Sequence, residues 1–401
     1  MKRVIALVTV CMMAFSMLLT GCGQKDITGN NGTIASAAAT GSAADAAAST
    51  AASTAAGDKG TGTKIDAKDM IVGFIYVGPV TDNGWTTAHD NGREYIKEQI
   101  PGVTTLIKEN VMEGAEAKKS IMELVDAGCK IIFTTSFGYM DPTLEVANEH
   151  PEVKFLHCSG FKTAENMSNY FGRMYEARYL SGIVAGLKTK NGKLGYVAAT
   201  QIPEVFNGVN AFTLGAQSVR PDATVTVRWS NTWYDTAKEK EAAVAVLDEG
   251  CDVITLHNDS TAVQIEAQDR GVFVIGYNLD IPTAAPKAYM TAPIWNWGPY
   301  YAAQVKAVMD GTWKSESYLG GLSDGLLSLA PLTANAPEGA QAKVDEVQKK
   351  ILDGSFKVFT GPIYGQDGSL KIKDGEVLPE SDIGGAMNWF VKGVEGTTDG
   401  K

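Results

Sequence analysis

Aromatic, amide and carboxylate side chains are concentrated in five short segments of this sequence. The segments are residues 81–85, 136–141, 229–235, 257–260 and 277–280. An aromatic face stacked on a flat heterocycle contributes about 1 to 3 kcal/mol per ring system. Amide and carboxylate groups supply paired hydrogen-bond donors and acceptors that match the edge of such a ring. The residue types therefore predict a binding site for a planar, nitrogen-containing molecule.

Each of these residues also has an ordinary structural interpretation. A tryptophan in such a segment often packs as a lid, and Asn83, Asp141 and Asp235 each stand where a helix N-cap is expected. Loops usually favour small polar residues, and an exposed indole without a ligand is unusual. The concentration of aromatic and amide groups in several loops at once therefore favours a shared ligand.

The residues of a catalytic centre are not apparent. The sequence has no GxxxxGK[ST], GxSxG or HExxH motif, and of its four histidines only His257 follows a predicted strand, where we expect a structural role. The five cysteines lack zinc-ligand spacing, and Cys129 and Cys251 have the context of small buried residues. We therefore predict no catalytic residue, no metal site and no cofactor.

Length and composition indicate the elements that must position these segments. A chain of 401 residues needs more than one hydrophobic core, and its 44% hydrophobic and 20% charged residues are typical of a globular protein. The net charge of -11 repels polyphosphate. Nucleic acid is therefore not an expected partner.

The first 67 residues read as an export signal followed by a tether. Lys2 and Arg3 precede an apolar run over residues 4–19 that is short for a membrane span. The sequence Leu-Thr-Gly-Cys at 19–22 resembles the lipobox of bacterial lipoproteins, in which the cysteine, here Cys22, carries the lipid. The alternative is a plain secretory peptide over residues 1–21 with an incidental cysteine. Residues 22–67 are rich in Ala, Ser, Thr and Gly and predict a disordered, lipid-anchored tether.

From residue 70 onward, short β-branched runs alternate with amphipathic stretches, which predicts an α/β fold of two parallel-sheet units. The first unit has predicted strands at 71–77, 104–107, 130–134 and 154–157, with helices at 85–99, 115–127 and 142–149. The second has strands at 194–198, 224–228, 253–256 and 272–276, with helices at 175–187, 204–219, 236–248 and 262–270. Such sheets bind ligands at the carboxyl ends of their strands, where the five segments lie.

Several motifs together resemble the basic membrane protein family, the lipid-anchored substrate-binding proteins of ABC importers akin to purine nucleoside receptor lipoproteins. The resemblance rests on the lipobox, Gly-Phe-Ile-Tyr at 73–76, Asp-Asn-Gly-Trp at 82–85, Thr-Ser-Phe-Gly-Tyr at 135–139 and Asp235 with its following lysines. It implies a two-lobed type I periplasmic-binding-protein fold with a hinge. Lobe 1 would comprise residues 68–172 and 293–314, and lobe 2 residues 173–292 and 315–401.

The resemblance also implies a site and partners. Trp85 and Trp233 take the positions of the two aromatics that hold a purine. The remaining ligand-binding residues that it implies are Asn83, Phe137, Tyr139, Asp141, Asn231, Asn258, Asn278 and Asp280. The partners would be a small purine and the permease subunits of an ABC importer, with the protein a monomer anchored by lipid on the outer side of the cell membrane.

Two departures from the nucleoside-binding members favour a free base. Asn278 replaces an aspartate that holds the ribose, and the segment at 291–296 lacks their lysine. Trp295 and Trp297 are expected to occupy the space of the sugar. The prediction is an adenine-like base, with a nucleoside receptor of the same family as the alternative. A nucleoside hydrolase-like enzyme, which would draw Asp82, Asp141 and Asp280 together, is the alternative from another class.

Overall fold

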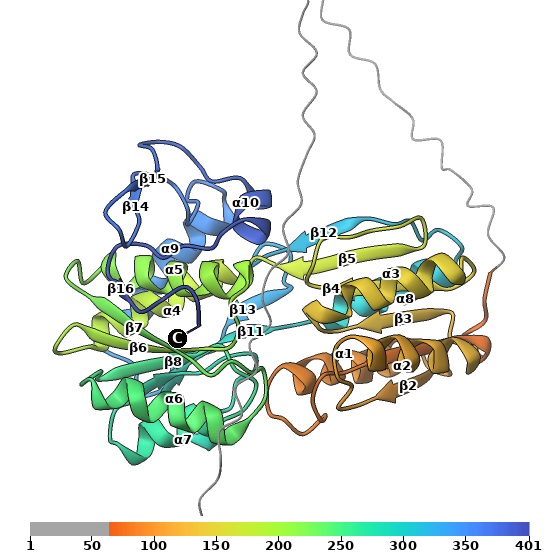
Figure 1. The fold of residues 1–401 in the computed structure, drawn as a ribbon, viewed down its shortest axis with the longest axis horizontal. Coiled ribbons are helices and arrows are strands. Elements are labelled where there is room, and N and C mark those ends of the chain that lie inside the picture. Colours follow the sequence, from red (N-terminus) through yellow and green to blue (C-terminus); the bar gives the residue numbers. More distant parts are fainter. Residues whose placement is uncertain (1–63, 401) are drawn as a thin grey trace, which may run out of the picture. The chain divides into compact units, whose positions relative to one another are not determined.

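The structure, a computed structural model, describes residues 64–400, which form two α/β lobes (Figure 1). The predicted signal peptide, the lipidation site Cys22 and nearly all of the predicted tether lie outside the described residues. Folded contacts begin slightly earlier than the predicted end of the tether, because the Ile65 amide donates to the Met309 carbonyl oxygen at 2.8 Å. Within the described part of the chain, no helix is long and apolar enough to cross a membrane.

Lobe 1 is built on a parallel six-stranded sheet in the order β12-β5-β4-β3-β1-β2. The strands are β1 (Ile71–Ile75), β2 (Thr104–Lys108), β3 (Ile131–Thr134), β4 (Lys154–Cys158), β5 (Met167–Gly172) and β12 (Ser317–Gly320). Side chains alternate between the two faces of each strand. Phe74 and Phe133 stack at 4.7 Å in the core under α1 (Trp85–Gln99) and α8 (Gly298–Met309). Ile75 and Ile132 face the opposite core, under α2 (Ala115–Asp126) and α3 (Met140–Glu149).

Lobe 2 repeats this architecture with a sheet in the order β10-β9-β8-β6-β7-β16. The strands are β6 (Lys193–Ala198), β7 (Thr224–Trp229), β8 (Val253–Leu256), β9 (Phe273–Ile275), β10 (Tyr289–Thr291) and β16 (Val394–Glu395). Helices α4 (Met174–Lys188), α5 (Pro203–Gln217) and α9 (Ala340–Leu352) lie on one side, with α6 (Thr236–Asp248) and α7 (Ala262–Asp269) on the other. Gly182 and Gly215 let α4 and α5 approach closely, since a Cβ at Gly215 would lie 2.0 Å from the Tyr179 carbonyl oxygen.

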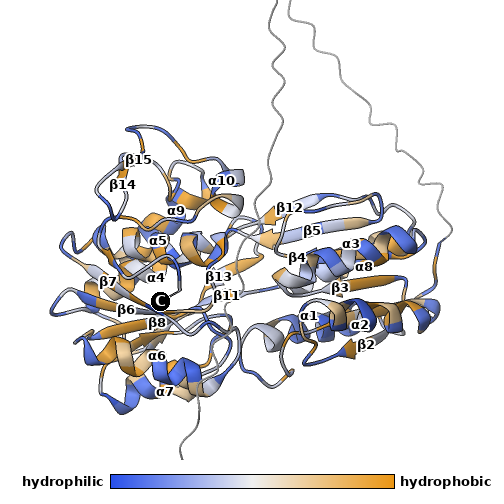
Figure 2. Cartoon of the chain, viewed as in Figure 1, coloured by the Kyte–Doolittle hydropathy of each residue, from blue (hydrophilic) through white to orange (hydrophobic). Residues whose placement is uncertain are grey.

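Hydropathy follows these layers. Figure 2 shows hydrophobic strands between helices whose outer surfaces are largely hydrophilic. All three described cysteines, Cys129, Cys158 and Cys251, are free and buried. Burial raises the pKa of Cys129 to about 12 and that of Cys251 to about 11. The expectation that Cys129 and Cys251 are small buried residues is therefore confirmed.

Three chain crossings join the lobes. The first runs from β5 into α4, the second from β10 into β11 (Pro293–Trp295), and the third from β12 into β13 (Leu327–Leu329). Strands β11 and β13 pair antiparallel. Arg173 ties the first crossing to the third, because it donates to the Leu319 carbonyl oxygen at 2.6 Å and pairs with Asp324 at 3.0 Å. These crossings form the hinge between the lobes.

The third crossing lies further along the chain than the predicted boundary at residue 314. Strand β12 pairs with β5 and so belongs to the sheet of lobe 1, whereas its residues were expected in lobe 2. It is an edge strand in which only Gly320 is buried, so its sequence has no buried hydrophobic pattern that would assign it to a sheet. Near the C-terminus, β14 (Ile363–Tyr364) and β15 (Leu370–Ile372) pair antiparallel as a hairpin.

Candidate functional site

A cavity lined by residues of both lobes lies between the lobes. Lobe 1 contributes Val77, Trp85, Ser136, Phe137 and Ser159, and lobe 2 contributes Glu204, Trp233, His257, Asp259 and Tyr277. Every one of these residues lies in the segment that follows a strand, after β1, β3 or β4 in lobe 1 and after β6, β7, β8 or β9 in lobe 2. The carboxyl ends of both sheets therefore meet at the cavity, as expected for parallel α/β sheets.

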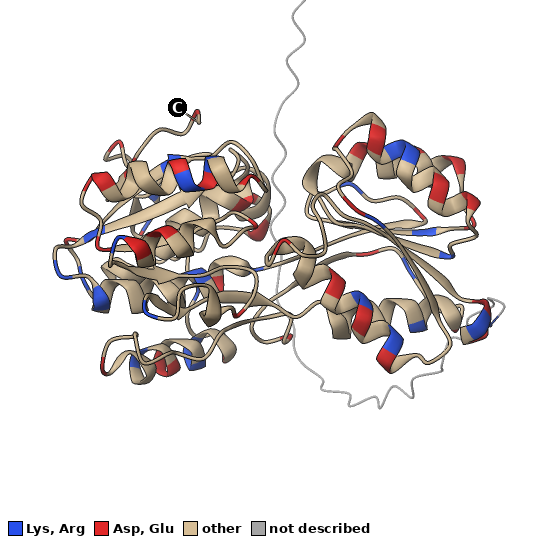
Figure 3. Cartoon of the chain, turned by 90° about the horizontal axis from the view of Figure 1, so that it is seen from below, with Lys and Arg blue, Asp and Glu red and all other residues tan. Residues whose placement is uncertain are grey.

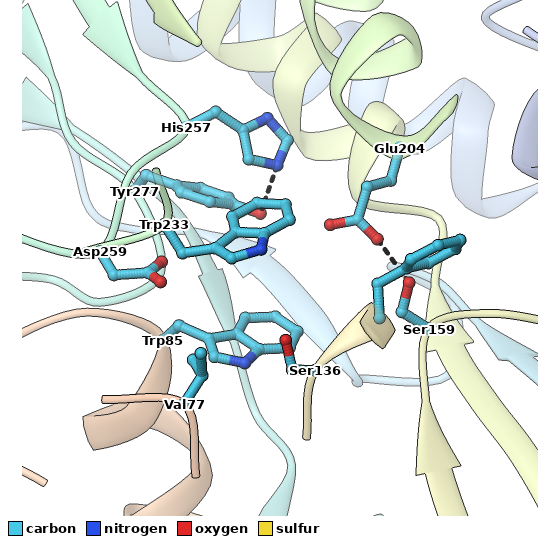
Figure 4. Close-up of a pocket in the computed structure, with 10 residues that line it drawn as sticks. Val77, Trp85, Ser136, Ser159, Glu204, Trp233, His257, Asp259 and Tyr277 are labelled. Atoms are coloured by element: carbon cyan, nitrogen blue, oxygen red, sulfur yellow. Dashed lines mark hydrogen bonds between the residues drawn. The ribbon is translucent and has the colours of Figure 1, made fainter. Parts of the chain in front are cut away.

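Two indoles form opposite walls of the cavity. Figure 4 shows Trp85 of lobe 1 facing Trp233 of lobe 2, with the Asp259 and Glu204 carboxyl groups toward opposite ends of the space between them. Trp85 is fixed in orientation because its Nε1 donates to the Thr135 carbonyl oxygen at 2.6 Å. The arrangement resembles a slot for a flat ring.

The expected role of Trp295 and Trp297 in filling a sugar site is not what the structure shows. They stack on each other at 4.5 Å and support the back of Trp85, with ring centroids 5.7 and 5.8 Å from it. Neither lines the cavity. The reason is that α8 begins at Gly298 and directs Trp297 into the core of lobe 1, beside His89 and Tyr301.

The loop that carries Trp233 is shaped by buried polar side chains. Asn258 donates through Nδ2 to Ser230 Oγ at 2.7 Å and to the Thr232 carbonyl oxygen at 2.9 Å. The Asp259 amide donates to the carbonyl oxygen of Trp233 at 3.0 Å. The second indole is therefore held by the backbone next to it as well as by packing.

The two carboxyl groups at the cavity are unusual acids. Asp259 is buried, and desolvation, followed by the nearby charge of Asp82, raises its pKa well above the ordinary value. Asn278 Nδ2 donates to Asp259 Oδ1 at 3.1 Å. Glu204 as a residue is partly exposed, but its carboxyl group faces the cavity, where burial raises its pKa to about 7. A neutral Asp259 can donate a hydrogen bond as well as accept one.

His257 is part of a neutral aromatic cluster. Its Nδ1 lies 3.1 Å from the Tyr196 hydroxyl and its Nε2 lies 3.2 Å from the Tyr277 hydroxyl. Burial, assisted by the charge of Arg178, lowers the pKa of His257 well below its usual value. The Arg178 guanidinium lies 3.8 Å from the centroid of the Tyr277 ring, behind the residues that line the cavity. The cavity lining itself therefore contains no lysine or arginine.

Of the predicted ligand-binding residues, Trp85, Phe137 and Trp233 line the cavity. Asn258 and Asn278 are buried one step behind it, where they orient the Trp233 loop and Asp259. The prediction placed both asparagines in direct contact with the ligand, and the structure does not.

The other five predicted residues lie away from the cavity lining. Asn83 is exposed and donates to the Thr81 carbonyl oxygen, and Asn231 bonds to Gln201 and the Gly400 carbonyl oxygen. Tyr139 is fully buried and donates to the Val111 carbonyl oxygen at 2.6 Å. Asp141 is exposed and paired with Lys162 at 2.6 Å, and Asp280 accepts from Tyr289 at 2.8 Å. Local partners occupy these side chains in each case.

The residue list implied by the resemblance omitted seven residues that line the cavity: Val77, Ser136, Ser159, Glu204, His257, Asp259 and Tyr277. Ser136, His257, Asp259 and Tyr277 belong to the segments that the residue types singled out. For Val77, Ser159 and Glu204 the available signal was position, because each follows a strand at the ligand-binding edge of its sheet. In the segments after β8 and β9, the residues beside the chosen asparagines face the cavity instead.

Of the three expected helix N-caps, Asp235 is observed, whereas Asn83 and Asp141 do not cap their helices. Asp235 caps α6 by accepting from the Ala237 and Lys238 amides, as expected. At α1 the expected cap, Asn83, is replaced by Asp82, whose carboxylate accepts from the Gly84 and Thr86 amides at 2.8 Å each. Asp141 lies within the first turn of α3 instead of capping it.

The acidic cluster that a hydrolase would need is not assembled. Asp82 caps a helix, and Asp141 and Asp280 are held by Lys162 and Tyr289 away from the cavity lining. Among residues 64–400, no group of three or more His, Cys, Asp or Glu residues could hold a metal ion. Figure 3 shows acidic and basic residues interspersed along the outer helices.

Similarity to known proteins covers most of this chain. Residues 70–356 match the family described as PnrA-like ABC transporter substrate-binding proteins. The chain is 48% identical over 325 residues to a purine-binding protein of Brucella abortus, covering 81% of this chain and 92% of that one. It is 36% identical over 324 residues to a Haloferax volcanii protein whose name describes it as an ABC transporter glucose-binding protein, covering 80% of each chain.

Solved structures share the fold. A solute-binding protein of an ABC transporter from Conexibacter woesei aligns with a TM-score of 0.60 at 22% identity, covering 72% of this chain and 98% of that chain. A solute-binding protein from Aeropyrum pernix aligns with a TM-score of 0.62 at 20% identity, covering 72% and 92%. The predicted two-lobed α/β fold is confirmed.

Proposed function

Because this chain belongs to the family of PnrA-like ABC transporter substrate-binding proteins, we propose that its cavity captures a free purine base of the adenine type. The protein is a binding component of a transporter and not an enzyme. It acts as a monomer outside the cytoplasm and delivers the base to permease subunits. The observation that carries the proposal is the pair of facing indoles, Trp85 and Trp233, with a carboxyl group at each end of the slot.

The chemistry of the lining favours this ligand. Two aromatic faces contribute about 1 to 3 kcal/mol each when they stack on a base. Micromolar affinity corresponds to about -8 kcal/mol, which stacking and a few edge hydrogen bonds supply. A lining without lysine or arginine, with two acids, disfavours any phosphorylated ligand.

The two acids have different roles on the ring edge. Asn278 occupies Oδ1 of Asp259, so the proton of the neutral acid lies on Oδ2 and can be donated to an unprotonated ring nitrogen. Adenine presents such a nitrogen beside its amino group. Glu204, at the opposite end of the slot, accepts from a ring N–H. The name of the Brucella abortus relative, a purine-binding protein, supports the same ligand class.

Transport requires the lobes to open and close about the three crossings. A ligand that contacts Trp85 and Trp233 together binds the closed form better than the open form and therefore shifts the equilibrium toward closure. The permease distinguishes the closed, loaded protein from the open one.

Isothermal titration calorimetry of the ligand-stripped protein against adenine, guanine, hypoxanthine, adenosine, inosine and glucose tests the proposal. Adenine is expected to bind with a Kd on the order of micromolar, and more tightly than adenosine. Glucose is included because the name of the Haloferax volcanii relative describes a glucose-binding protein. Binding of glucose without binding of any purine would refute the proposal, and tighter binding of adenosine than of adenine would make the ligand a nucleoside.

We propose further that Cys22 carries the lipid anchor, based on the sequence Leu-Thr-Gly-Cys at 19–22. Each methylene group of the acyl chains that is buried in the membrane contributes about 0.8 kcal/mol to membrane binding. Mass spectrometry of the protein extracted from membranes is expected to show an N-terminus at Cys22 with added acyl mass. A mature protein released into the medium with an unmodified Cys22 would support the plain secretory peptide instead.

A further inference from the structure

The cavity adjoins a much larger groove between the lobes. The groove has a volume of about 690 Å³ and is lined mainly by β5, β12, the start of α5 and the region of α10 (Glu380–Gly385). Three residues, Phe137, Ser159 and Glu204, line both spaces. These three residues therefore stand at the boundary between the slot for the ring and the open groove.

At this boundary a hydrogen bond joins the two lobes. Ser159, after β4 of lobe 1, donates through Oγ to Glu204 Oε2 at 2.7 Å, and Glu204 lies in the first turn of α5 in lobe 2 (Figure 4). The bond spans 45 positions of sequence and lies at the Glu204 end of the slot. A ring substituent that points toward the groove must pass this pair.

The serine is held rigidly in place. Ser159 has a φ of 67°, and its amide donates to the Tyr170 carbonyl oxygen at 3.0 Å. The following residue, Gly160, also has a positive φ of 66°, and a Cβ there would lie 2.7 Å from His157 Nε2 and 2.8 Å from Met140 Sδ. The backbone is thus fixed where it presents the Ser159 hydroxyl to the opposite lobe.

We propose that the Ser159–Glu204 pair determines ligand size. It restricts the slot to a free base and separates the slot from the groove that would hold a sugar. The inference rests on the proposed purine ligand. With the pair intact, Glu204 accepts the ring N–H that a nucleoside lacks, and its side chain blocks the path of the substituent. With the pair removed, the sugar of a nucleoside extends into the groove, whose lining includes the polar side chains of Asn169, Asn207 and Ser317.

The test measures the Kd values of adenine and adenosine for wild-type protein, Glu204→Ala and Ser159→Ala by titration calorimetry. Glu204→Ala is expected to lower the ratio of the adenosine Kd to the adenine Kd at least about tenfold, because it removes both the acceptor and the obstruction. Ser159→Ala is expected to lower the same ratio by about threefold, because it frees the carboxylate without removing it.

Two control variants remove a serine hydroxyl and a glutamate carboxylate at positions away from the cavity and the groove. Ser315→Ala deletes a hydroxyl that donates to the Met167 carbonyl oxygen, and Glu241→Ala deletes an exposed carboxylate on α6. Neither residue lines the cavity or the groove, and both variants should keep the wild-type ratio.

The outcomes separate this inference from the function on which it rests. A wild-type protein that binds no purine refutes the proposed function and the inference together. A wild-type protein that binds adenine, with an unchanged ratio in Glu204→Ala, refutes only the role of the pair. A shift in Glu204→Ala without any shift in Ser159→Ala also overturns it, because Glu204 would then act on the ring alone.

Discussion

Replacing Gly84 by alanine is expected to reduce the affinity for the base about 100-fold or more. A Cβ at Gly84 would lie 2.0 Å from the carbonyl oxygen of Asp259 in the opposite lobe. Both groups are backbone or attached directly to it, so no side-chain rotation relieves the overlap. The lobes must stay further apart. Trp233 and Asp259 then no longer contact the base, whereas Trp85 still stacks on it.

The measurement combines titration calorimetry with small-angle X-ray scattering. Wild-type protein is expected to become more compact when adenine is added, and Gly84→Ala is expected to show little change. Gly78→Ala is the matched control in the same segment, since the nearest atoms to its Cβ would be side-chain atoms, Thr86 Oγ1 at 3.2 Å and Asp82 Oδ2 at 3.7 Å, and not backbone. Wild-type affinity in Gly84→Ala would show that ligand binding does not need this close approach of the lobes.

Replacing Trp233 by alanine is expected to weaken base binding by about 1 to 3 kcal/mol, which corresponds to a rise in Kd of about 5- to 150-fold. Trp233 forms one wall of the slot, and its removal leaves the base stacked on Trp85 alone. The loop should keep its shape, because Asn258 and the Asp259 amide hold it through backbone carbonyl oxygens.

Trp229→Phe is the control for this prediction. Trp229 lies in the same lobe, at the end of β7, but packs against Phe206 and Phe390 and does not line the cavity. The Trp229→Phe variant should have the wild-type Kd for adenine. An unchanged Kd in Trp233→Ala would mean that this indole packs as a lid over the site and does not stack on the ligand.

Much of the architecture followed from sequence periodicity. Helices α1 and α6 have the bounds that the hydrophobic pattern predicts, because their buried residues repeat with the period of a helix. Strand β8 also has its predicted bounds, as a short run that is buried at every position. The edge strands β12 and β16 were not predicted, since β12 is largely exposed and β16 has only two residues, one of them buried. An element with little buried surface leaves little pattern in its sequence.

The sequence also identified the two aromatic walls of the cavity, since the family resemblance implied Trp85 and Trp233 and both line it. Only the tertiary structure decided which neighbour in each loop faces the cavity. Asp259 faces the cavity while Asn258 turns back to the loop, and Tyr277 lines the cavity while Asn278 holds Asp259. The direction of a loop side chain depends on backbone angles that composition does not specify, such as the φ of 67° at Asn278.

The pairing of Ser159 with Glu204 depended on the tertiary structure even more strongly. Neither residue belongs to a recognisable sequence motif. A serine after a strand and a glutamate in the first turn of a helix are both common. They become a contact only because two separate sheets direct their carboxyl ends toward the same space. Sequence periodicity specifies each lobe, whereas contacts across the cleft depend on how the hinge places one lobe against the other.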